Sequence, residues 1–259
     1  MKRMLHIFIV ALLPAVSGLA GTITMEVKCA IQGSNLIVQV LNKGDEAARN
    51  VGARIVFNRT EIETAPLPEL PPASPRGVPV VLSLEGLRGT YPAIVTVNFE
   101  DANGYPFSTV SVIMVPAEDA KHSDVMGALD VTRIRGKTEV PLRLRSSVEE
   151  PVTVHYRLIL PRELSAENAT GKITVPSGGQ SMVPLVFENF SALPNSRYGL
   201  HAVLEYEAGG RHYTSVASGS VQVIPPRGGK AWYFWVAAAV VMIAIVISFI
   251  PRRPKLAAG

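Results

Sequence analysis

The stretch Gly89–Ser108 reads GTYPAIVTVNFEDANGYPFS, and a second stretch, Ser196–Ser215, reads SRYGLHAVLEYEAGGRHYTS. Each has a tyrosine, an alternating apolar run, a glycine-containing tip and a second apolar run, which together indicate a β-hairpin. Four positions correspond: Tyr91 with Tyr198, Phe99 with Tyr206, Gly104 with Gly210, and Phe107 with Tyr213. The spacing falls by one residue within the tip, so the chain is predicted to contain two copies of one unit.

The remainder of both copies also has the pattern of short strands. LIVQVLN, ARIVFN and VPVVLSL are rich in branched residues and are bounded by Gly, Asn or Pro. TEVPLRLRSS, EPVTVHYRLILP and VPSGGQSMVPLVF follow in the same order in the second copy. Strands at this spacing without intervening helices predict antiparallel sandwiches. A tyrosine at the start of the sixth strand, at Tyr91 and Tyr198, further indicates the tyrosine corner of immunoglobulin-like sandwiches.

These patterns define the domains. We predict an all-β chain with two tandem immunoglobulin-like β-sandwiches, over residues 21–116 and 125–225. The polar, strand-poor segment PAEDAKHSD predicts a linker at 117–124. The proline-rich stretch Ala65–Pro75 is interpreted as a stiff loop that crosses between the two sheets.

Residues 1–20 have the features of a secretory signal peptide. Lys2 and Arg3 precede a short apolar stretch, and Gly18 and Ala20 supply small residues at the cleavage site. The sequence therefore predicts export, with removal of this leader after Ala20.

Residues 231–250 form an uncharged apolar run, which predicts a transmembrane helix. The anchoring residues expected at its two ends are Trp232, Tyr233 and Trp235 before it and Arg252, Arg253 and Lys255 after it. With a cytoplasmic stub at 251–259, these features predict a single-pass type I protein of the plasma (inner) membrane, with a periplasmic or extracellular ectodomain. The lipid bilayer would then be a partner of this span. Gly228 and Gly229 leave open whether the chain is cleaved there, ahead of the predicted span.

The charge of the predicted ectodomain is close to neutral. Five of the 25 Lys and Arg residues lie in the leader and the tail, so 20 remain against 21 Asp and Glu. The high isoelectric point of the whole chain therefore does not indicate a basic face on the ectodomain, and we predict no nucleic-acid partner. The single cysteine, Cys29, excludes an intrachain disulfide and is expected to lie in the first strand as a small apolar side chain.

Few residues offer chemistry. Glu100, Asp101 and Asn103 crowd at one predicted hairpin tip, as a calcium loop would require, but the second copy keeps only Glu207, which favours a plain hairpin. His201 and His212 lie on adjacent predicted strands and could approach each other, although half-exposed strand histidines are favoured over a zinc site. His122 is placed in the linker and His155 on a strand. No nucleophile elbow, phosphate loop or dinucleotide motif occurs. We therefore predict no catalytic residues, no cofactor and no metal.

The segment QVLNKGDEAARNVGARIVF, Gln39–Phe57, resembles the opening of the CARDB family of bacterial cell-adhesion-related domains. The residues that carry the resemblance are Asn42, Gly44, Asn50 and Val51. The second copy reads RSSVEEPVTV and lacks the Asn-x-Gly turn. The resemblance implies a seven-stranded sandwich used as a surface spacer or binding module, without catalytic residues.

Together these features predict a non-catalytic, membrane-anchored protein that binds protein or glycan partners outside the cytoplasm. The alternative is an accessory subunit of a membrane transport or secretion complex, which docks through its ectodomain and its single span.

Overall fold

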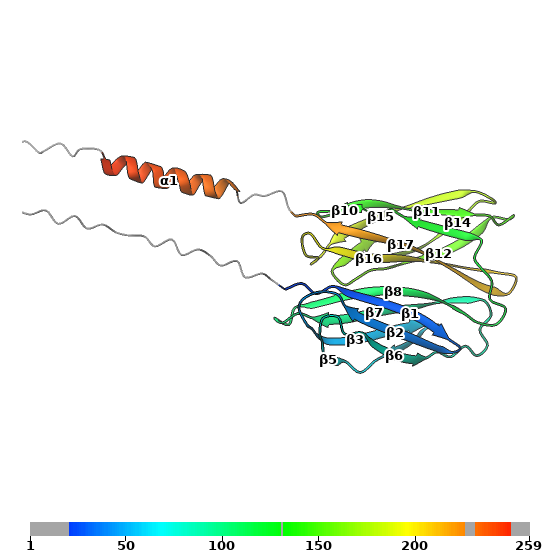
Figure 1. The fold of residues 1–259 in the computed structure, drawn as a ribbon. Helices are drawn as coiled ribbons and strands as arrows, with labels where there is room; N and C mark the ends of the chain where they lie inside the picture. The colour runs from blue at the N-terminus through cyan, green and yellow to red at the C-terminus, as the bar shows by residue number, and fades with distance from the viewer. Residues whose placement is uncertain (1–20, 131, 226–230, 250–259) are drawn as a thin grey trace, which may run out of the picture.

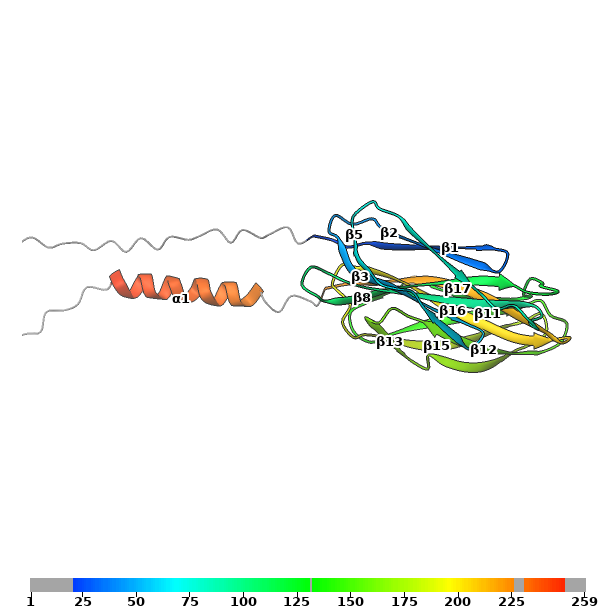
Figure 2. The same cartoon turned by 90° about the horizontal axis from the view of Figure 1, so that it is seen from below.

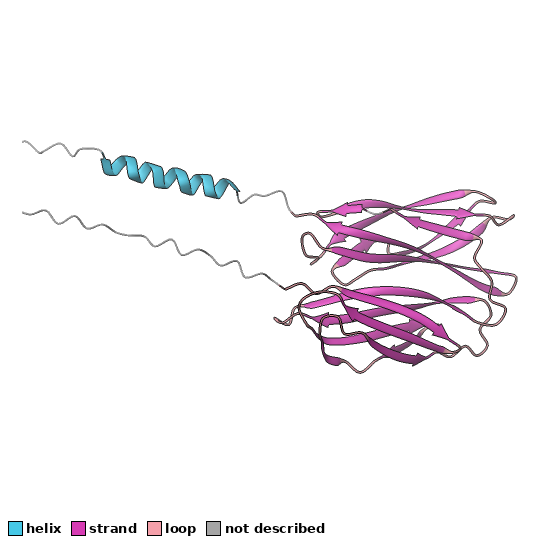
Figure 3. Cartoon of the chain, viewed as in Figure 1, coloured by secondary structure: helices cyan, strands magenta, loops and turns pink. Residues whose placement is uncertain are grey.

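A computed structural model describes residues 21–130, 132–225 and 231–249 (Figure 1). Within these residues the chain forms seventeen strands and one helix (Figure 3). The first eight strands are β1 Met25–Gln32, β2 Asn35–Asn42, β3 Ala48–Phe57, β4 Thr60–Glu63, β5 Leu67–Leu70, β6 Arg76–Val81, β7 Thr90–Glu100 and β8 Pro106–Pro116. The next nine are β9 Val125–Leu129, β10 Thr132–Ile134, β11 Thr138–Ser146, β12 Val152–Ile159, β13 Leu164–Glu167, β14 Thr170–Val175, β15 Gln180–Asn189, β16 Arg197–Ala208 and β17 Arg211–Val223.

Strands β1–β8 form the first sandwich. One sheet has the order β1-β2-β6, and the other has the order β4-β3-β7-β8, with β5 also pairing with β3. The proline-rich stretch contributes β5 and then leads to β6 in the opposite sheet, so the predicted crossing is confirmed. The sheet β1-β2-β6 faces the sheet that contains β3, β7 and β8. This division of the strands between two sheets is the immunoglobulin-like arrangement.

Strands β9–β17 form the second sandwich in a similar way. One sheet has the order β13-β15-β11-β9, and the other has the order β10-β17-β16-β12-β14. All pairs are antiparallel except β10 with β17. The short strands β4, β5, β10 and β13 raise both sandwiches above the seven strands that the CARDB resemblance implies.

Each sandwich has its own core, because alternate side chains of facing strands point inward. Leu36, Ile55 and Val95 are completely buried in the first, and Leu142, Leu185 and Phe187 in the second. Burying one such side chain stabilises the fold by about 1.5–3 kcal/mol. The one cysteine among the described residues is free, so each sandwich is held together by packing and hydrogen bonds.

The two sandwiches pack against each other through one sheet each. Ile94 and Val110 of the first sandwich and Ile159 and Val203 of the second form a buried apolar cluster. Val56 and Val112 pack against this cluster. We call the contact made by these six residues the seam. Figure 1 shows the result as four layers of sheet, and Figure 2 shows the sandwiches overlapping along their length.

The two hairpins that define the repeat are present, as β7–β8 and β16–β17. Phe99 stacks on Phe107 with ring centroids 5.8 Å apart, and Tyr206 stacks on Tyr213 at 4.9 Å. The corresponding residues of the two copies therefore make the same cross-strand pair, which confirms the repeat. At the tips Gly104 has φ 76° and Gly210 has φ 69°, the positive angles that tight turns require.

The apolar run near the C-terminus forms helix α1 (Ala231–Phe249), and residue 250 of the predicted helix lies outside the described residues. The described part of this helix extends roughly 28 Å at about 1.5 Å per residue, and the hydrocarbon layer is about 30 Å thick. In the described part of the chain, no helix has both the length and the apolar character needed to cross a membrane. The prediction of a helix is thus confirmed for 231–249, and the prediction that it is a transmembrane span is corrected.

The predicted anchoring residues fall partly outside the description. Trp232, Tyr233 and Trp235 lie on α1, and the side chain of Trp235 is exposed. The leader at 1–20, the pair Gly228 and Gly229, and the basic residues Arg252, Arg253 and Lys255 lie outside the described residues.

Candidate functional site at the seam

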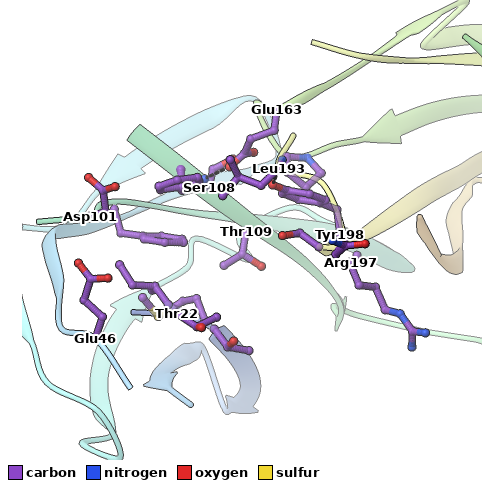
Figure 4. A pocket seen from close by; sticks show the side chains of 18 of the residues that line it. Thr22, Glu46, Asp101, Ser108, Thr109, Glu163, Leu193, Arg197 and Tyr198 are labelled. Atoms are coloured by element: carbon purple, nitrogen blue, oxygen red, sulfur yellow. Dashed lines mark hydrogen bonds between the residues drawn. The ribbon is translucent and has the colours of Figure 1, made fainter. Parts of the chain in front are cut away.

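A cavity of about 500 Å³ lies at one end of the seam, between the two sandwiches (Figure 4). This volume is within the range typical of small-molecule sites. Its walls come from both units: Gly21–Met25, Glu46, Phe99, Asp101 and Phe107–Thr109 from the first sandwich, and Pro161, Glu163, Leu193 and Asn195–Gly199 from the second. The cavity therefore exists only while the sandwiches stay packed.

The N-terminal segment before β1 forms one wall and is held by the turn between β2 and β3. The Lys43 N–H donates to the Thr24 carbonyl at 2.7 Å, and the Asp45 N–H donates to the Thr22 carbonyl at 2.9 Å. In return the Thr22 N–H donates to Asp45 Oδ1 at 2.5 Å. A Cβ on Gly44 would lie 1.9 Å from the Thr22 carbonyl oxygen, so only glycine allows this approach.

Asn42 organises the same turn from inside the protein. Its side chain is fully buried, and its Nδ2 donates to the Glu46 carbonyl at 2.7 Å and the Leu70 carbonyl at 3.3 Å. Its Oδ1 accepts from the Gly44 N–H at 3.0 Å. The residues of the Asn-x-Gly turn thus have structural roles in this chain.

Asn50 and Val51 also have structural roles. Asn50 has φ 51° at a shift in the β3–β7 register, and its side chain donates to Glu100 Oε2 at 2.7 Å. Val51 packs in the first core. The four residues that carry the family resemblance therefore shape the sandwich and its turn.

The acidic hairpin tip is held by its own backbone. Asp101 Oδ1 accepts from the Asn103 N–H at 2.9 Å and the Tyr105 N–H at 2.8 Å. Glu100 is bonded by Asn50, as described above. Within the described residues no group of three or more His, Cys, Asp or Glu side chains could hold a metal ion. Glu100, Asp101 and Asn103 lie at the tip of the β7–β8 hairpin, and Asp101 also lines the cavity.

A buried carboxyl group joins the sandwiches at the inner end of the cavity. Glu163, 1% exposed, accepts from the Ser108 N–H at 2.8 Å and from the Ser108 hydroxyl at 3.3 Å. The Ser108 hydroxyl in turn accepts from the Arg162 N–H at 2.7 Å. Burial raises the pKa of Glu163, and the hydrogen bonds from Ser108 oppose that shift. Figure 4 shows this pair at the edge of the cavity, where it fixes the relative position of β8 and the start of β13.

The two repeat tyrosines have different roles. The Tyr198 hydroxyl accepts from the Leu193 N–H at 3.1 Å, which confirms a tyrosine corner in the second sandwich. Tyr91 instead stacks on His212 of the second sandwich, with ring centroids 4.4 Å apart and planes 9° from parallel. The tyrosine of the first copy therefore contributes to the contact between the sandwiches.

The backbone also crosses the boundary between the sandwiches beside Tyr91. The His212 N–H donates to the Arg88 carbonyl at 3.0 Å, and Gly89 and His212 form an isolated parallel bridge. The buried Thr214 hydroxyl donates to the Thr90 carbonyl at 2.7 Å. These bonds align β7 of the first sandwich with β17 of the second.

His212 lies between two carboxylates of β16. Its Nδ1 is 2.7 Å from Glu207 Oε1, and its Nε2 is 3.2 Å from Glu205 Oε1. A neutral imidazole can donate from only one nitrogen, so both contacts are satisfied by the protonated ring alone. Burial alone would lower the pKa of His212, but the hydrogen bonds to Glu205 and Glu207 outweigh burial and raise the pKa.

We expect a stability difference that depends on pH to follow from this contact. The folded-state pKa of His212 is raised above its ordinary value of 6.5. The contribution of the protonated ring to the free energy of unfolding is therefore full below pH 6.5 and is lost as pH rises through the folded-state pKa. Wild type should exceed His212→Gln in free energy of unfolding by about 1–2 kcal/mol near pH 5.5, and by clearly less near pH 8.5. Urea unfolding at the two pH values measures this, and an equal difference at both would contradict it.

The other candidate residues stay apart. His201 Nδ1 contacts the Ser218 hydroxyl at 2.8 Å, and His201 Nε2 lies 3.4 Å from the Val110 carbonyl. Burial lowers the pKa of His201. His201 and His212 thus occupy separate positions in the β16–β17 ladder, whereas His122 and His155 are exposed. Cys29 lies on β1 as predicted, half-buried, with a thiol pKa raised by burial.

The pair Ser108–Glu163 and the whole seam are absent from the expectations drawn from sequence. A signal was present in β7, where Pro92–Val95 are all buried, on both faces of the strand. An uninterrupted apolar run of this kind indicates a strand covered on both sides. It could have predicted a second packing face on this sheet, but not the surface that covers it.

No protein-family description matches the chain, and no curated protein matches it. Among solved structures, the Salmonella alpha-2-macroglobulin mutant Y1175G is 10% identical, with a TM-score of 0.34, over 79% of this chain and 16% of that one. CBD12 from CALX1.2 is 12% identical, with a TM-score of 0.27, over 74% of this chain and 94% of that one. A protein of unknown function from Porphyromonas gingivalis W83 is 9% identical, with a TM-score of 0.30, over 77% of this chain and 99% of that one.

The chain spans about a sixth of the length of the macroglobulin. Because all three TM-scores are below 0.5, these likenesses assign neither a family nor a function. The immunoglobulin-like description rests on the strand order of the two sandwiches.

Proposed function

We propose that this chain is a non-catalytic, exported binding module of CARDB-like character, which holds a protein or glycan partner in the cavity at the seam. The observation that carries the proposal is that both sandwiches supply the cavity walls while buried hydrogen bonds hold the sandwiches together. A cavity built on rigid elements needs little ordering when a ligand binds, which favours affinity.

The cavity wall has the chemistry of a recognition site. Phe99, Phe107 and Tyr198 offer aromatic surface, and Asp101 and Arg197 offer opposite charges. Asp101 and Glu163 are engaged in hydrogen bonds that shape the fold. The Arg197 side chain is exposed and makes no hydrogen bond or ion pair within the described residues. Arg197 and Thr109 are therefore the side chains with which to test binding.

Binding is tested with the full chain on an array of cell-envelope glycans and, separately, on immobilised cell-envelope proteins. Thr109→Phe fills the cavity from β8, and Arg197→Glu reverses a charge at its wall, so each should weaken binding at least about tenfold. The matched control is Arg145→Glu, an exposed charge reversal on β11 in the outer sheet of the second sandwich. Equal binding by all variants would place the ligand elsewhere, and product formation from any bound glycan would contradict a non-catalytic role.

The accessory-subunit alternative makes a different prediction. If the chain serves a transport or secretion complex, multi-span membrane proteins should co-purify with it at native expression, and Thr109→Phe should leave this association unchanged. Loss of that association in Thr109→Phe would instead place the partner protein in the cavity.

A further inference from the structure

The predicted cleavage point of the leader coincides with one wall of the cavity. The small residues Gly18 and Ala20 place the cut between Ala20 and Gly21. Gly21 lines the cavity. Hydrolysis by a leader peptidase would add water across this peptide bond, leaving a carboxylate on Ala20 and an ammonium group on Gly21. A new positive charge would therefore appear at a defined place in the structure.

Glu46 lies beside that place. A Cβ added to Gly21 would be 2.6 Å from Glu46 Oε2, so this carboxylate oxygen is close to the Gly21 backbone. Glu46 Oε1 accepts from the Ala102 N–H at 3.2 Å, which orients the carboxylate toward the β7–β8 hairpin. In the part of the chain that the structure describes, Glu46 Oε2 accepts no hydrogen bond. The carboxylate is thus held in place with one oxygen available.

Arg49 donates to the Ala102 carbonyl at 3.2 Å, but within the described residues no basic side chain forms an ion pair with Glu46. Lys43, on the same turn, is paired with Glu26 at 3.0 Å. Figure 4 shows Glu46 and Asp101 together on one side of the cavity and Arg197 on the other side. An ammonium group at Gly21 would therefore meet a carboxylate with no competing basic residue among those that line this end.

We propose that leader removal creates an α-ammonium group at Gly21 that forms an ion pair with Glu46, and that this pair fixes the N-terminal wall of the cavity. This inference rests on the export that we propose above. Before cleavage the same nitrogen is an uncharged amide, so the precursor lacks the pair. The cavity then reaches its final form only in the processed chain, which couples ligand binding to export.

The first test is the identity of the mature N-terminus, read by mass spectrometry of the chain recovered from producing cells. The second is an NMR titration of the chain beginning at Gly21, with 13C-labelled glycine, in which the N-terminal signal is identified by its loss on Nα-acetylation. An unpaired α-amino group titrates at about 7.7–8.0. The Gly21 ammonium should titrate about 0.5 unit higher in the wild type, as expected for a partly exposed ion pair.

Two variants separate the ion pair from a general effect. Glu46→Gln removes the carboxylate, and Gly44→Ala displaces the N-terminal segment while leaving Glu46 intact, so both should return the titration to the ordinary value. Glu69→Gln, which removes an exposed carboxylate from β5 of the same sandwich, should leave it raised.

The inference is overturned by a mature N-terminus other than Gly21, by an ordinary titration in the wild type, or by equal shifts in Glu46→Gln and Glu69→Gln. Its failure can be told apart from failure of the binding function. A raised titration in a chain that binds no glycan or envelope protein would sustain the ion pair and refute the binding proposal.

Discussion

Replacing Gly89 by alanine is expected to separate the two sandwiches. Gly89 has φ +106°, and a Cβ added to it would lie 2.0 Å from the His212 carbonyl oxygen and 2.8 Å from the His212 amide nitrogen. Both are backbone atoms, so no side chain can rotate away to make room. The clash and the unfavourable φ together should cost about 3 kcal/mol or more.

Scanning calorimetry of the full chain tests this expectation. The wild type should unfold in one transition, because the seam couples the two cores. Gly89→Ala should lower the first melting temperature by about 8 °C and split the transition in two. Gly86→Ala is the matched control, since Gly86 also has a positive φ, +72°, but no heavy atom lies within 4 Å of an added Cβ. An equal fall in melting temperature in both variants would show that the close approach of Gly89 to His212 does not contribute to stability.

Replacing Asn42 by alanine should destabilise the first sandwich by about 2–4 kcal/mol. The variant removes three hydrogen bonds from a fully buried position and leaves the Gly44 N–H and the Leu70 carbonyl without their side-chain partner. An unmade hydrogen bond in the interior costs the full desolvation of the group, because water cannot replace the partner.

Urea unfolding measures the loss. Asn35→Ala, at the exposed start of β2, is the control and should change the free energy of unfolding by no more than about 0.5 kcal/mol. A loss at Asn42 as small as at Asn35 would mean that the turn finds other partners. In that case the Asn-x-Gly pattern would not be explained by the turn's hydrogen bonds.

The hairpins and their repeat could be predicted from sequence because they depend on local patterns. Alternation fixes which face of a strand is buried, and Gly104 and Gly210 fix where the chain turns. The equivalence of Phe99–Phe107 with Tyr206–Tyr213 was readable because the two members of each pair are close in the chain.

The seam could not be predicted in this way. Glu163 meets Ser108 across 55 residues of sequence, and Thr214 meets Thr90 across 124. Nothing in the local pattern of PRELS identifies a carboxyl group that will be buried against another domain. The helix at 231–249 was predicted correctly as an element, because an apolar run of this length favours a helix. The same run did not predict correctly whether that helix spans a membrane.

The course of the chain has a mechanical consequence. The first residues of the N-terminal segment and Asn195, whose N–H is bonded to the Val223 carbonyl, line the same cavity, so the body begins and ends at one end (Figures 1 and 2). The linker connects the sandwiches at the other end, beside Gly89 and His212. A pulling force between residues 21 and 225 would therefore have to open the seam before the two sandwiches could align in the direction of the force. The first resistance to extension should therefore come from the contact between the domains. The strands within each domain should separate only after that contact has opened.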